Sequence, residues 1–192
     1  MYSDESSFKT IRSSSVMVRR PLGADPYDPR FTVKTVKWPD SIMVWGCFSG
    51  NKGRGGLFFL PPKTTMNGEK YKAVLENHLL PSMQMHESTH FLQDGAPCHK
   101  SKLVMGFLKE QANFHIIDWP GNSPDLNPFE NVWSHMKYML RDRDTISVPK
   151  LKAEILDLWV KRTSIEYLQT LSDSMPRRLE AVIKAKGNMT KW

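Results

Sequence analysis

Residues 90–139 read HFLQDGAPCHKSKLVMGFLKEQANFHIIDWPGNSPDLNPFENVWSHMKYM, and this stretch decides the fold. HFLQD (90–94) and FHIID (114–118) are apolar, have the length of strands, and each end on an aspartate. Between them, HKSKLVMGFLKEQ (99–111) has the apolar spacing of a helix. A loop rich in Pro, Asn and Gly (119–128) then leads into a second helix. This alternation of strands and helices predicts an α/β fold.

The segments before this stretch are strand-like, and those after it are helical. Strands are expected at SFKTIR (7–12), VMVRR (16–20), FTVKTVKW (31–38), SIMVWGCF (41–48) and GLFFLP (56–61), with NKGRGG (51–56) as a turn. A helix is expected to begin at Asn67, and everything from Phe129 onward has a helical period. The sequence therefore predicts a mixed sheet flanked by helices, with a C-terminal helical extension.

Composition favours a globular protein with a polyanionic partner. The chain has 192 residues and a formal net charge of +7, which suits nucleic acid, although many proteins are mildly basic for solubility alone. No apolar run approaches the roughly 20 residues of a membrane-spanning helix. The two cysteines, Cys47 and Cys98, lack the spacing of a zinc site. They leave a disulfide open, with a reducing compartment as the simpler interpretation.

Three acidic residues fall at the boundaries of predicted elements. Asp4 is expected to end or closely follow the first strand, Asp94 ends HFLQD, and Glu130 lies in the first turn of the helix after the SPDLNP loop. Ligand sites of α/β sheets form at the C-terminal ends of strands, so these carboxylates can meet in space. Clustered carboxylates repel one another, and hard divalent cations compensate their charge. Two such ions about 4 Å apart can support in-line phosphoryl transfer.

Each of the three acidic residues also has a purely structural explanation. Asp4 can be a turn residue, and Glu5 is an equally acidic neighbour. Asp94 precedes a glycine, which is a common turn dipeptide. Asn127 is a good N-cap for the helix that carries Glu130, and this glutamate then occupies the position of a capping box. Spacing alone does not decide between these interpretations.

Three other features have mainly structural interpretations. His99 lies close to Asp94, but a single histidine near an aspartate is more often a surface or capping residue than a ligand. The apolar stripe of the helix after the SPDLNP loop is expected to pack on the sheet, and it comprises Phe129, Val132, Trp133, Met136 and Leu140. Basic clusters in the late helices either contact DNA or aid solubility, and they comprise Lys161-Arg162, Arg177-Arg178 and Lys184 with Lys186.

Four segments together resemble one family. YSDESSF (2–8), SIMVWGCFS (41–49), FLQDGAPCHKS (91–101) and DWPGNSPDLNPFENVWSHMK (118–137) are similar to the successive blocks of the catalytic DDE domain of mariner-superfamily transposases. The last block is long and highly specific, FLQDGAPCHKS is moderately specific, and YSDESSF is weak alone. The resemblance runs over nearly the whole chain and implies an RNase H-like fold.

The resemblance also implies a chemistry and a site. The positions that match the family's metal-bound triad are Asp4, Asp94 and Glu130, as catalytic residues and as ligands of two Mg²⁺ or Mn²⁺ ions. The implied activity is cut-and-paste DNA transposition: water attacks a phosphodiester at the element's end, and the freed 3′-hydroxyl then attacks target DNA. The implied partners are the double-stranded DNA of transposon ends and target, without a membrane. A homodimer and action in the nucleus belong to the same expectation.

Departures from the family pattern keep an alternative open. Family members carry a paired helix-turn-helix region ahead of the catalytic domain, whereas this chain starts at the first catalytic segment. We therefore expect a catalytic domain over residues 1–145 with a truncated first strand, and a helical extension over residues 146–192. The alternative is a catalytically inactive transposase-derived fragment that binds DNA or a partner. Another nuclease of the same fold, such as a ribonuclease H or a resolvase, is disfavoured by the SPDLNPFENVW block.

Overall fold

The computed structural model describes residues 1–10, 19–32, 39–111, 114–117, 119–120 and 123–192. Parts of three expected strands, residues 11–12, 16–18 and 33–38, fall outside these ranges. The described remainder of two of them is not strand, so those expectations are wrong there: Arg19 and Arg20 belong to no element, and Phe31 ends a short 3-10 helix (Pro29–Phe31). Within the described ranges, no helix has both the length and the apolar character needed to cross a membrane.

Among the described residues, five strands form two hydrogen-bonded groups. β1 (Tyr2–Lys9) pairs antiparallel with β2 (Ser41–Ser49), which pairs antiparallel with β3 (Gly53–Phe59). β4 (His90–Phe91) pairs in parallel with β5 (His115–Ile116). The predicted mixed sheet is therefore present. β3 begins at Gly53, so the expected turn at 51–56 is too long: its second half is strand that pairs with the end of β2.

Main-chain hydrogen bonds join the two groups between β1 and the residue after β4. The Ser3 amide donates to the Leu92 carbonyl at 3.1 Å, and the Leu92 amide donates to the Met1 carbonyl at 2.9 Å. Tyr2 and Leu92 form a parallel bridge. The spatial order is therefore β3-β2-β1-β4-β5, with β1 bonded along both edges.

Asp4 lies inside β1 rather than at its end. It is the third residue of the strand and pairs with Gly46 of β2, and the pairing continues to Lys9. The expectation that Asp4 ends or follows the strand is wrong, because β2 offers partners for five more residues of β1. Since side chains alternate along a strand, Asp4 and Glu5 point to opposite faces of the sheet.

Seven α-helices are present among the described residues. They are α1 (Gly68–Val74), α2 (Leu80–Met85), α3 (Lys102–Glu110), α4 (Pro128–Met139), α5 (Val148–Lys161), α6 (Ile165–Asp173) and α7 (Met175–Lys184). A π-helical turn over Leu75–Leu79 joins α1 to α2. Side-chain oxygens of Asn67, Ser101 and Asn127 accept main-chain N–H bonds at the starts of α1, α3 and α4. The predicted cap at Asn127 and the expected helix start at Asn67 are thus confirmed.

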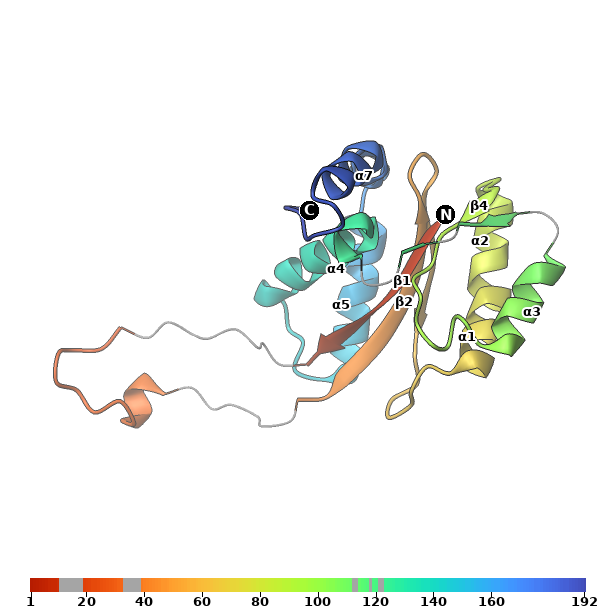
Figure 1. The fold of residues 1–192 in the computed structure, drawn as a ribbon. Coiled ribbons are helices and arrows are strands. Elements are labelled where there is room, and N and C mark those ends of the chain that lie inside the picture. Colours follow the sequence, from red (N-terminus) through yellow and green to blue (C-terminus); the bar gives the residue numbers. More distant parts are fainter. Residues whose placement is uncertain (11–18, 33–38, 112–113, 118, 121–122) are drawn as a thin grey trace.

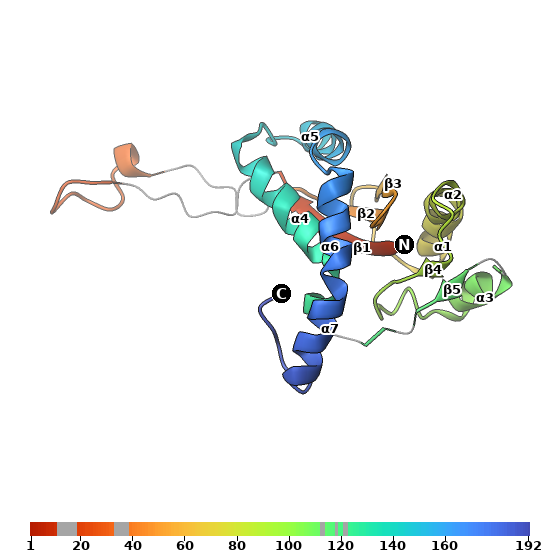
Figure 2. The same cartoon turned by 90° about the horizontal axis from the view of Figure 1, so that it is seen from above.

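The helices cover both faces of the sheet, giving three layers. Figures 1 and 2 show α1, α2 and α3 on one side and α4, α5 and α6 on the other. Val44 and Phe48 of β2 enter the core beneath α4 and α5, whereas Trp45 and Cys47 enter the core beneath α1 and α3. β2 is buried on both faces for this reason, as its continuous apolar run predicts. Cys47 and Cys98 are both free thiols.

The apolar stripe of α4 packs on the sheet as expected. Phe129 and Trp133 are fully buried, and their rings lie 4.7 Å apart between centroids. Trp133 also meets the edge of the Phe8 ring from β1 at 5.8 Å. Helices beyond residue 145 share this core, since Leu151 and Leu168 belong to the same buried cluster. The first turn of α4 is thereby held against the part of β1 that carries Asp4.

Candidate active site

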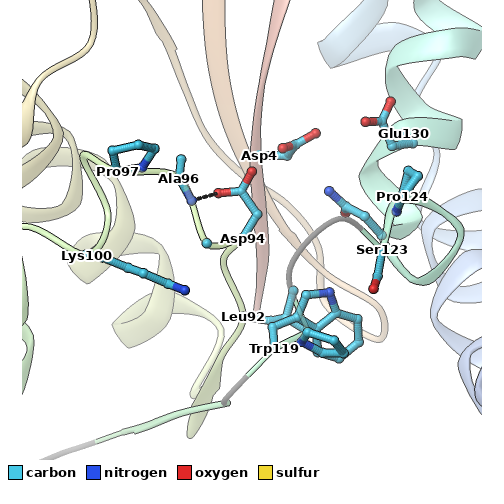
Figure 3. Close-up of a pocket in the computed structure, with 13 residues that line it drawn as sticks. Asp4, Leu92, Asp94, Ala96, Pro97, Lys100, Trp119, Ser123, Pro124 and Glu130 are labelled. Atoms are coloured by element: carbon cyan, nitrogen blue, oxygen red, sulfur yellow. Dashed lines mark hydrogen bonds between the residues drawn. The ribbon is translucent and has the colours of Figure 1, made fainter. Parts of the chain in front are cut away.

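A pocket of about 370 Å³ opens at one end of the sheet, and all three predicted site residues line it. Asp4 comes from β1, Asp94 from the segment after β4, and Glu130 from the first turn of α4. Figure 3 shows Asp4 between the other two carboxylates. Glu5 is absent from this lining because it points to the opposite face of β1. The fold thus separates two acidic neighbours that the sequence could not tell apart.

Asp4 is the buried member of the three carboxylates. It is 8% exposed, and its Oδ2 accepts a hydrogen bond from Trp133 Nε1 at 3.0 Å. Burial raises the pKa of Asp4 to about 8, and the neighbouring carboxylates of Glu5, Glu130 and Asp94 add to the rise. This carboxyl is therefore neutral at pH 7 unless a cation enters the pocket.

Asp94 is exposed, unlike Asp4, and its Oδ1 is held by two hydrogen-bond donors. That oxygen accepts the Ala96 main-chain N–H at 3.0 Å and lies 2.7 Å from His99 Nδ1. The hydrogen bond with His99 is the main reason that the pKa of Asp94 lies below its ordinary value. Asp94 is therefore ionised at neutral pH.

Glu130 is presented by the start of α4. Asn127 caps this helix by accepting the Phe129 N–H at 3.0 Å, and Pro128 occupies the first turn. The Asn127 cap is the purely structural explanation that the sequence offered, yet it leaves Glu130 exposed and lining the pocket with Asp4. Capping and site formation are compatible, because Asn127 does the capping and Glu130 faces the pocket.

The carboxylates converge on one pocket without forming a closed ligand cage. Among the described residues, no group of three or more His, Cys, Asp or Glu side chains is close enough to hold a metal ion as it stands. The donor set is nonetheless all oxygen: burial is the main reason that the pKa of Asp4 is raised, and the neighbouring carboxylates, Glu130 and Asp94 among them, add to the rise. Hard divalent cations suit such a set because they take carboxylate oxygens together with water or phosphate oxygens.

Lys100 is a cationic residue of the pocket that sequence reasoning missed. Its ammonium group lies over Gly95, where an added Cβ would be 3.0 Å from Nζ. Figure 3 shows it on the Asp94 side, with Trp119 on the neighbouring wall. A lysine beside three carboxylates is suited to hold a phosphate near them. The HKS letters at 99–101 were the signal, since they place a cation six residues after the aspartate, just before α3.

His99 and Arg178 are buried, contrary to their sequence-based interpretations. His99 is 2% exposed and contacts the carboxylates of both Asp94 and Glu5. Burial lowers the pKa of His99, but the hydrogen bonds with Asp94 and Glu5 outweigh it and raise the pKa to about 10. Arg178 is 1% exposed, which rules out the DNA or solubility role expected for the second member of the Arg177-Arg178 pair.

The Arg178 guanidinium braces the loop that leads to Glu130. It donates to the Asp125 carbonyl at 3.1 Å and to Asn131 Oδ1 at 2.8 Å, so it spans both sides of the α4 start. The Asp125 carboxylate in turn accepts the main-chain N–H and the hydroxyl of Thr190, each at 2.9 Å. α7 and the segment after it therefore fix the position of Glu130 from outside the pocket.

Comparison with known proteins agrees with this architecture. Residues 1–152 match the family described as DDE superfamily endonuclease. The Tcb2 transposase of Caenorhabditis briggsae is 33% identical, and the Tc1 transposase of Caenorhabditis elegans is 33% identical; each alignment covers all of this chain and 70% of the relative.

Solved structures show the same fold. The Mos1 mariner paired-end complex with Mn superposes with a TM-score of 0.80 at 23% identity, over 99% of this chain and 56% of that one. The isolated catalytic domain of Mos1 mariner transposase gives 0.74 at 21% identity, over 99% of this chain and 83% of that one. The chain thus spans little more than half of the protein in that complex, and most of its catalytic domain. Fold and sequence together place this chain in the DDE superfamily of endonucleases, as a transposase catalytic domain of the Tc1/mariner type with an RNase H-like architecture.

Proposed function

We propose that this domain cuts and joins DNA strands with divalent cations held by Asp4, Asp94 and Glu130. The observation that carries the proposal is that three carboxylates from three separate elements line one pocket. Structural side chains have no reason to gather there, because their mutual repulsion costs free energy unless a cation offsets it. The proposed role of the whole protein is transposition, in line with the names of its relatives.

The proposed ions are two Mg²⁺ or Mn²⁺. The ligand atoms would be the carboxylate oxygens of the three acidic residues, with water and DNA phosphate oxygens completing the shell. Mos1 structures bear titles with Mn and with Mg, which supports the same choice of metal here. When bound, such ions activate the attacking oxygen and stabilise the leaving oxygen of a phosphodiester.

The residues of the chain supply position and charge around that chemistry. Trp133 Nε1 holds Asp4 through Oδ2, and Ala96 and His99 hold Asp94 through Oδ1. Arg178 holds the loop before Glu130. Lys100 contributes a cation at the rim, where it pairs with a phosphate oxygen of the DNA. These fixed contacts orient the carboxylates before DNA arrives, which lowers the cost of reaching a productive geometry.

Double-stranded DNA is the proposed partner, as transposon end and as target. The net charge of +7 favours a polyanion, and Mos1 relatives of this fold were solved as paired-end complexes with a transposon end. Assembly as a homodimer and action in the nucleus, where such DNA lies, belong to the same proposal. The boundary near residue 145 between catalytic domain and helical extension is likewise proposed.

A plasmid-nicking assay tests this function. The parent chain and an Asp94→Asn variant are incubated with supercoiled plasmid in Mg²⁺, Mn²⁺ or a chelator. Metal-dependent nicking is expected for the parent and is lost in the variant, while DNA binding measured by fluorescence anisotropy stays the same. Asp173→Asn, the same chemical change at the exposed last residue of α6, is the matched control and should nick like the parent.

The outcomes separate the two functional hypotheses. If Asp94→Asn nicks as fast as the parent, Asp94 is no ligand and the proposed site is wrong. If the parent binds DNA but nicks in neither metal, the catalytically inactive DNA-binding fragment is the better description.

A further inference from the structure

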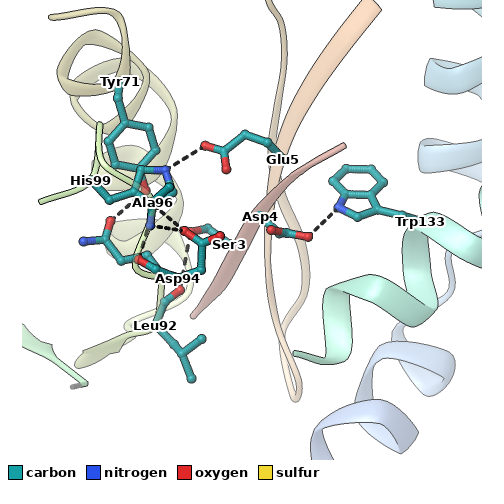
Figure 4. A network of polar contacts seen from close by, with 10 residues as sticks. Ser3, Asp4, Glu5, Tyr71, Leu92, Asp94, Ala96, His99 and Trp133 are labelled. Atoms are coloured by element: carbon teal, nitrogen blue, oxygen red, sulfur yellow. Dashed lines mark hydrogen bonds and ion pairs between the residues drawn. The ribbon is translucent and has the colours of Figure 1, made fainter. Parts of the chain in front are cut away.

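A chain of three polar side chains links the far face of β1 to the pocket. Glu5 Oε1 lies 3.1 Å from His99 Nε2, and Asp94 Oδ1 lies 2.7 Å from His99 Nδ1. Figure 4 shows His99 between the two carboxylates, with Asp4 on the other side of the strand. Because Asp4 and Glu5 are consecutive, β1 contributes to the site through one face and supports it through the other.

His99 is fixed on every side by its surroundings. Its ring stacks on the buried Tyr71 ring at 3.9 Å between centroids. Each ring nitrogen faces a carboxylate oxygen, so both nitrogens act as donors. Nδ1 also lies 3.3 Å from the Asp94 main-chain carbonyl. Tyr71 donates its hydroxyl proton to Gln93 Oε1 at 2.7 Å, which secures the residue before Asp94.

These contacts act on one oxygen of Asp94. Both the Ala96 N–H and the His99 ring donate to Oδ1, and neither uses Oδ2. Two donors on a single oxygen fix the rotation of the carboxylate about its side chain. They leave the second oxygen as the one available to a cation in the pocket.

We propose that His99 is a positioning residue that sets the orientation in which Asp94 presents its free oxygen to a bound cation, and so the rate of nicking rather than the affinity for the metal, and that Glu5 acts through His99 by fixing its ring. The inference rests on the proposed function, because it assigns a role toward a cation that Asp94 would bind. It also assigns Glu5, the acidic neighbour outside the pocket, a defined task. A merely structural role would instead limit His99 to stabilising the segment between β4 and α3.

The first test detects the hydrogen bonds of His99 with Glu5 and Asp94, and it requires neither metal nor enzymatic activity. Nuclear magnetic resonance of protein with ¹⁵N-labelled histidine is expected to show two protected ring N–H protons for His99. Glu5→Ala should remove the protection at Nε2 and leave that at Nδ1. If the parent shows no protected ring proton, or if Glu5→Ala changes neither, the bridge does not exist in solution and the proposal is overturned.

The second test separates positioning from charge. Single-turnover plasmid nicking is measured for His99→Ala across Mn²⁺ concentrations, and Mn²⁺ binding is measured separately by electron paramagnetic resonance. Loss of orientation predicts a rate about 10–100-fold lower at saturating Mn²⁺ that extra metal does not restore. Mn²⁺ binding should persist, because the variant removes a positive charge beside two carboxylates. A rate that returns to the parent's at high Mn²⁺ would overturn the positioning role.

Matched variants keep the result interpretable. His135→Ala, at an exposed histidine of α4, should leave rate and binding unchanged. Glu5→Gln keeps an acceptor oxygen for Nε2 and should lose less rate than Glu5→Ala. The double variant Glu5→Ala/His99→Ala should be no slower than His99→Ala alone, because Glu5 acts only through the histidine.

The same variants distinguish a loss of folding from a loss of function. Melting temperature and DNA affinity are measured for every variant. If His99→Ala is folded and nicks at the parent's rate, the proposal is wrong. If His99→Ala unfolds, the Glu5→Ala variant becomes the test. A folded Glu5→Ala variant that nicks at the parent's rate overturns the proposal, whereas a folded one that nicks more slowly supports it. If Asp94→Asn nicks like the parent, the proposed metal site fails, and the resonance experiment then stands alone as the test of the network.

Discussion

Replacing Asp4 with asparagine should stabilise the metal-free protein while removing its activity. The pKa of Asp4 is raised from 3.8 to about 8, so the folded protein holds a proton that the unfolded chain releases. Folding therefore becomes less favourable as pH rises from about 4 to about 8. Asparagine carries no such proton, and its side-chain oxygen can still accept the Trp133 N–H that Asp4 accepts at 3.0 Å.

The size of the effect follows from the same pKa. In the unfolded chain the pKa of Asp4 is 3.8, about three units below pH 7. Keeping this carboxyl protonated in the folded protein at pH 7 therefore costs about 4 kcal/mol. At pH 5 the cost falls to about 2 kcal/mol. Urea unfolding of parent and Asp4→Asn in chelator, at pH 5 and pH 7, measures the difference. A variant that is less stable than the parent, or a difference that does not grow with pH, would refute this account of Asp4.

Three further predictions concern groups around the pocket. Lys100→Gln should weaken DNA binding and lower the slope of log K against log salt concentration by about one unit, as for the loss of one phosphate contact. Fluorescence anisotropy at several salt concentrations measures this slope, and an unchanged slope argues against the contact. Gly46→Ala puts a Cβ 3.1 Å from the Trp133 ring and should cost about 1–3 kcal/mol in urea unfolding, so a stability equal to the parent's counts against tight packing of α4 on β2. Arg178→Met leaves the Asp125 carbonyl without its donor and should cost about 1–3 kcal/mol and slow nicking; nicking at the parent's rate means the brace is not needed.

Much of the fold follows from local sequence, because periodicity and caps act over a few residues. The apolar run of β2, the helix start at Asn67, the cap at Asn127 and the helical period from Phe129 onward predict elements that the structure contains. The errors occur where pairing overrides local preference. Gly53 looks like part of a turn but pairs with Ser49, and residues after Asp4 extend a strand because β2 lies beside them.

The site residues also divide into those that could be predicted from the sequence and those that depend on long-range contacts. The three acidic residues were found because the resemblance supplied their long-range relation, and the structure brings them to one pocket. His99 could not be assigned from sequence, since its partner Glu5 lies 94 positions away and only the pairing of β1 brings it near. Arg178 belongs with Arg177 to a basic pair typical of a surface, yet its acceptors Asp125 and Asn131 are 53 and 47 positions distant.

The helices after residue 145 have a bearing on the site beyond stability. α7 contributes Arg178, and Thr190 holds the Asp125 carboxylate, so the C-terminal segment supports the loop that leads to Glu130. The expected helical extension therefore supports the position of Glu130 through hydrogen bonds to the preceding loop. Shortening it should disturb the pocket even though none of its residues lines that pocket.

The most direct test of the central claim is the anomalous diffraction of manganese in crystals grown or soaked with Mn²⁺. The account predicts peaks in the pocket, within about 2.0–2.6 Å of carboxylate oxygens of Asp4 and of at least one of Asp94 and Glu130. Any peak within that distance of Asp94 should be missing from crystals of Asp94→Asn. Manganese bound elsewhere on the protein, with the three carboxylates contacting only water, would contradict the claim that this pocket performs phosphoryl transfer.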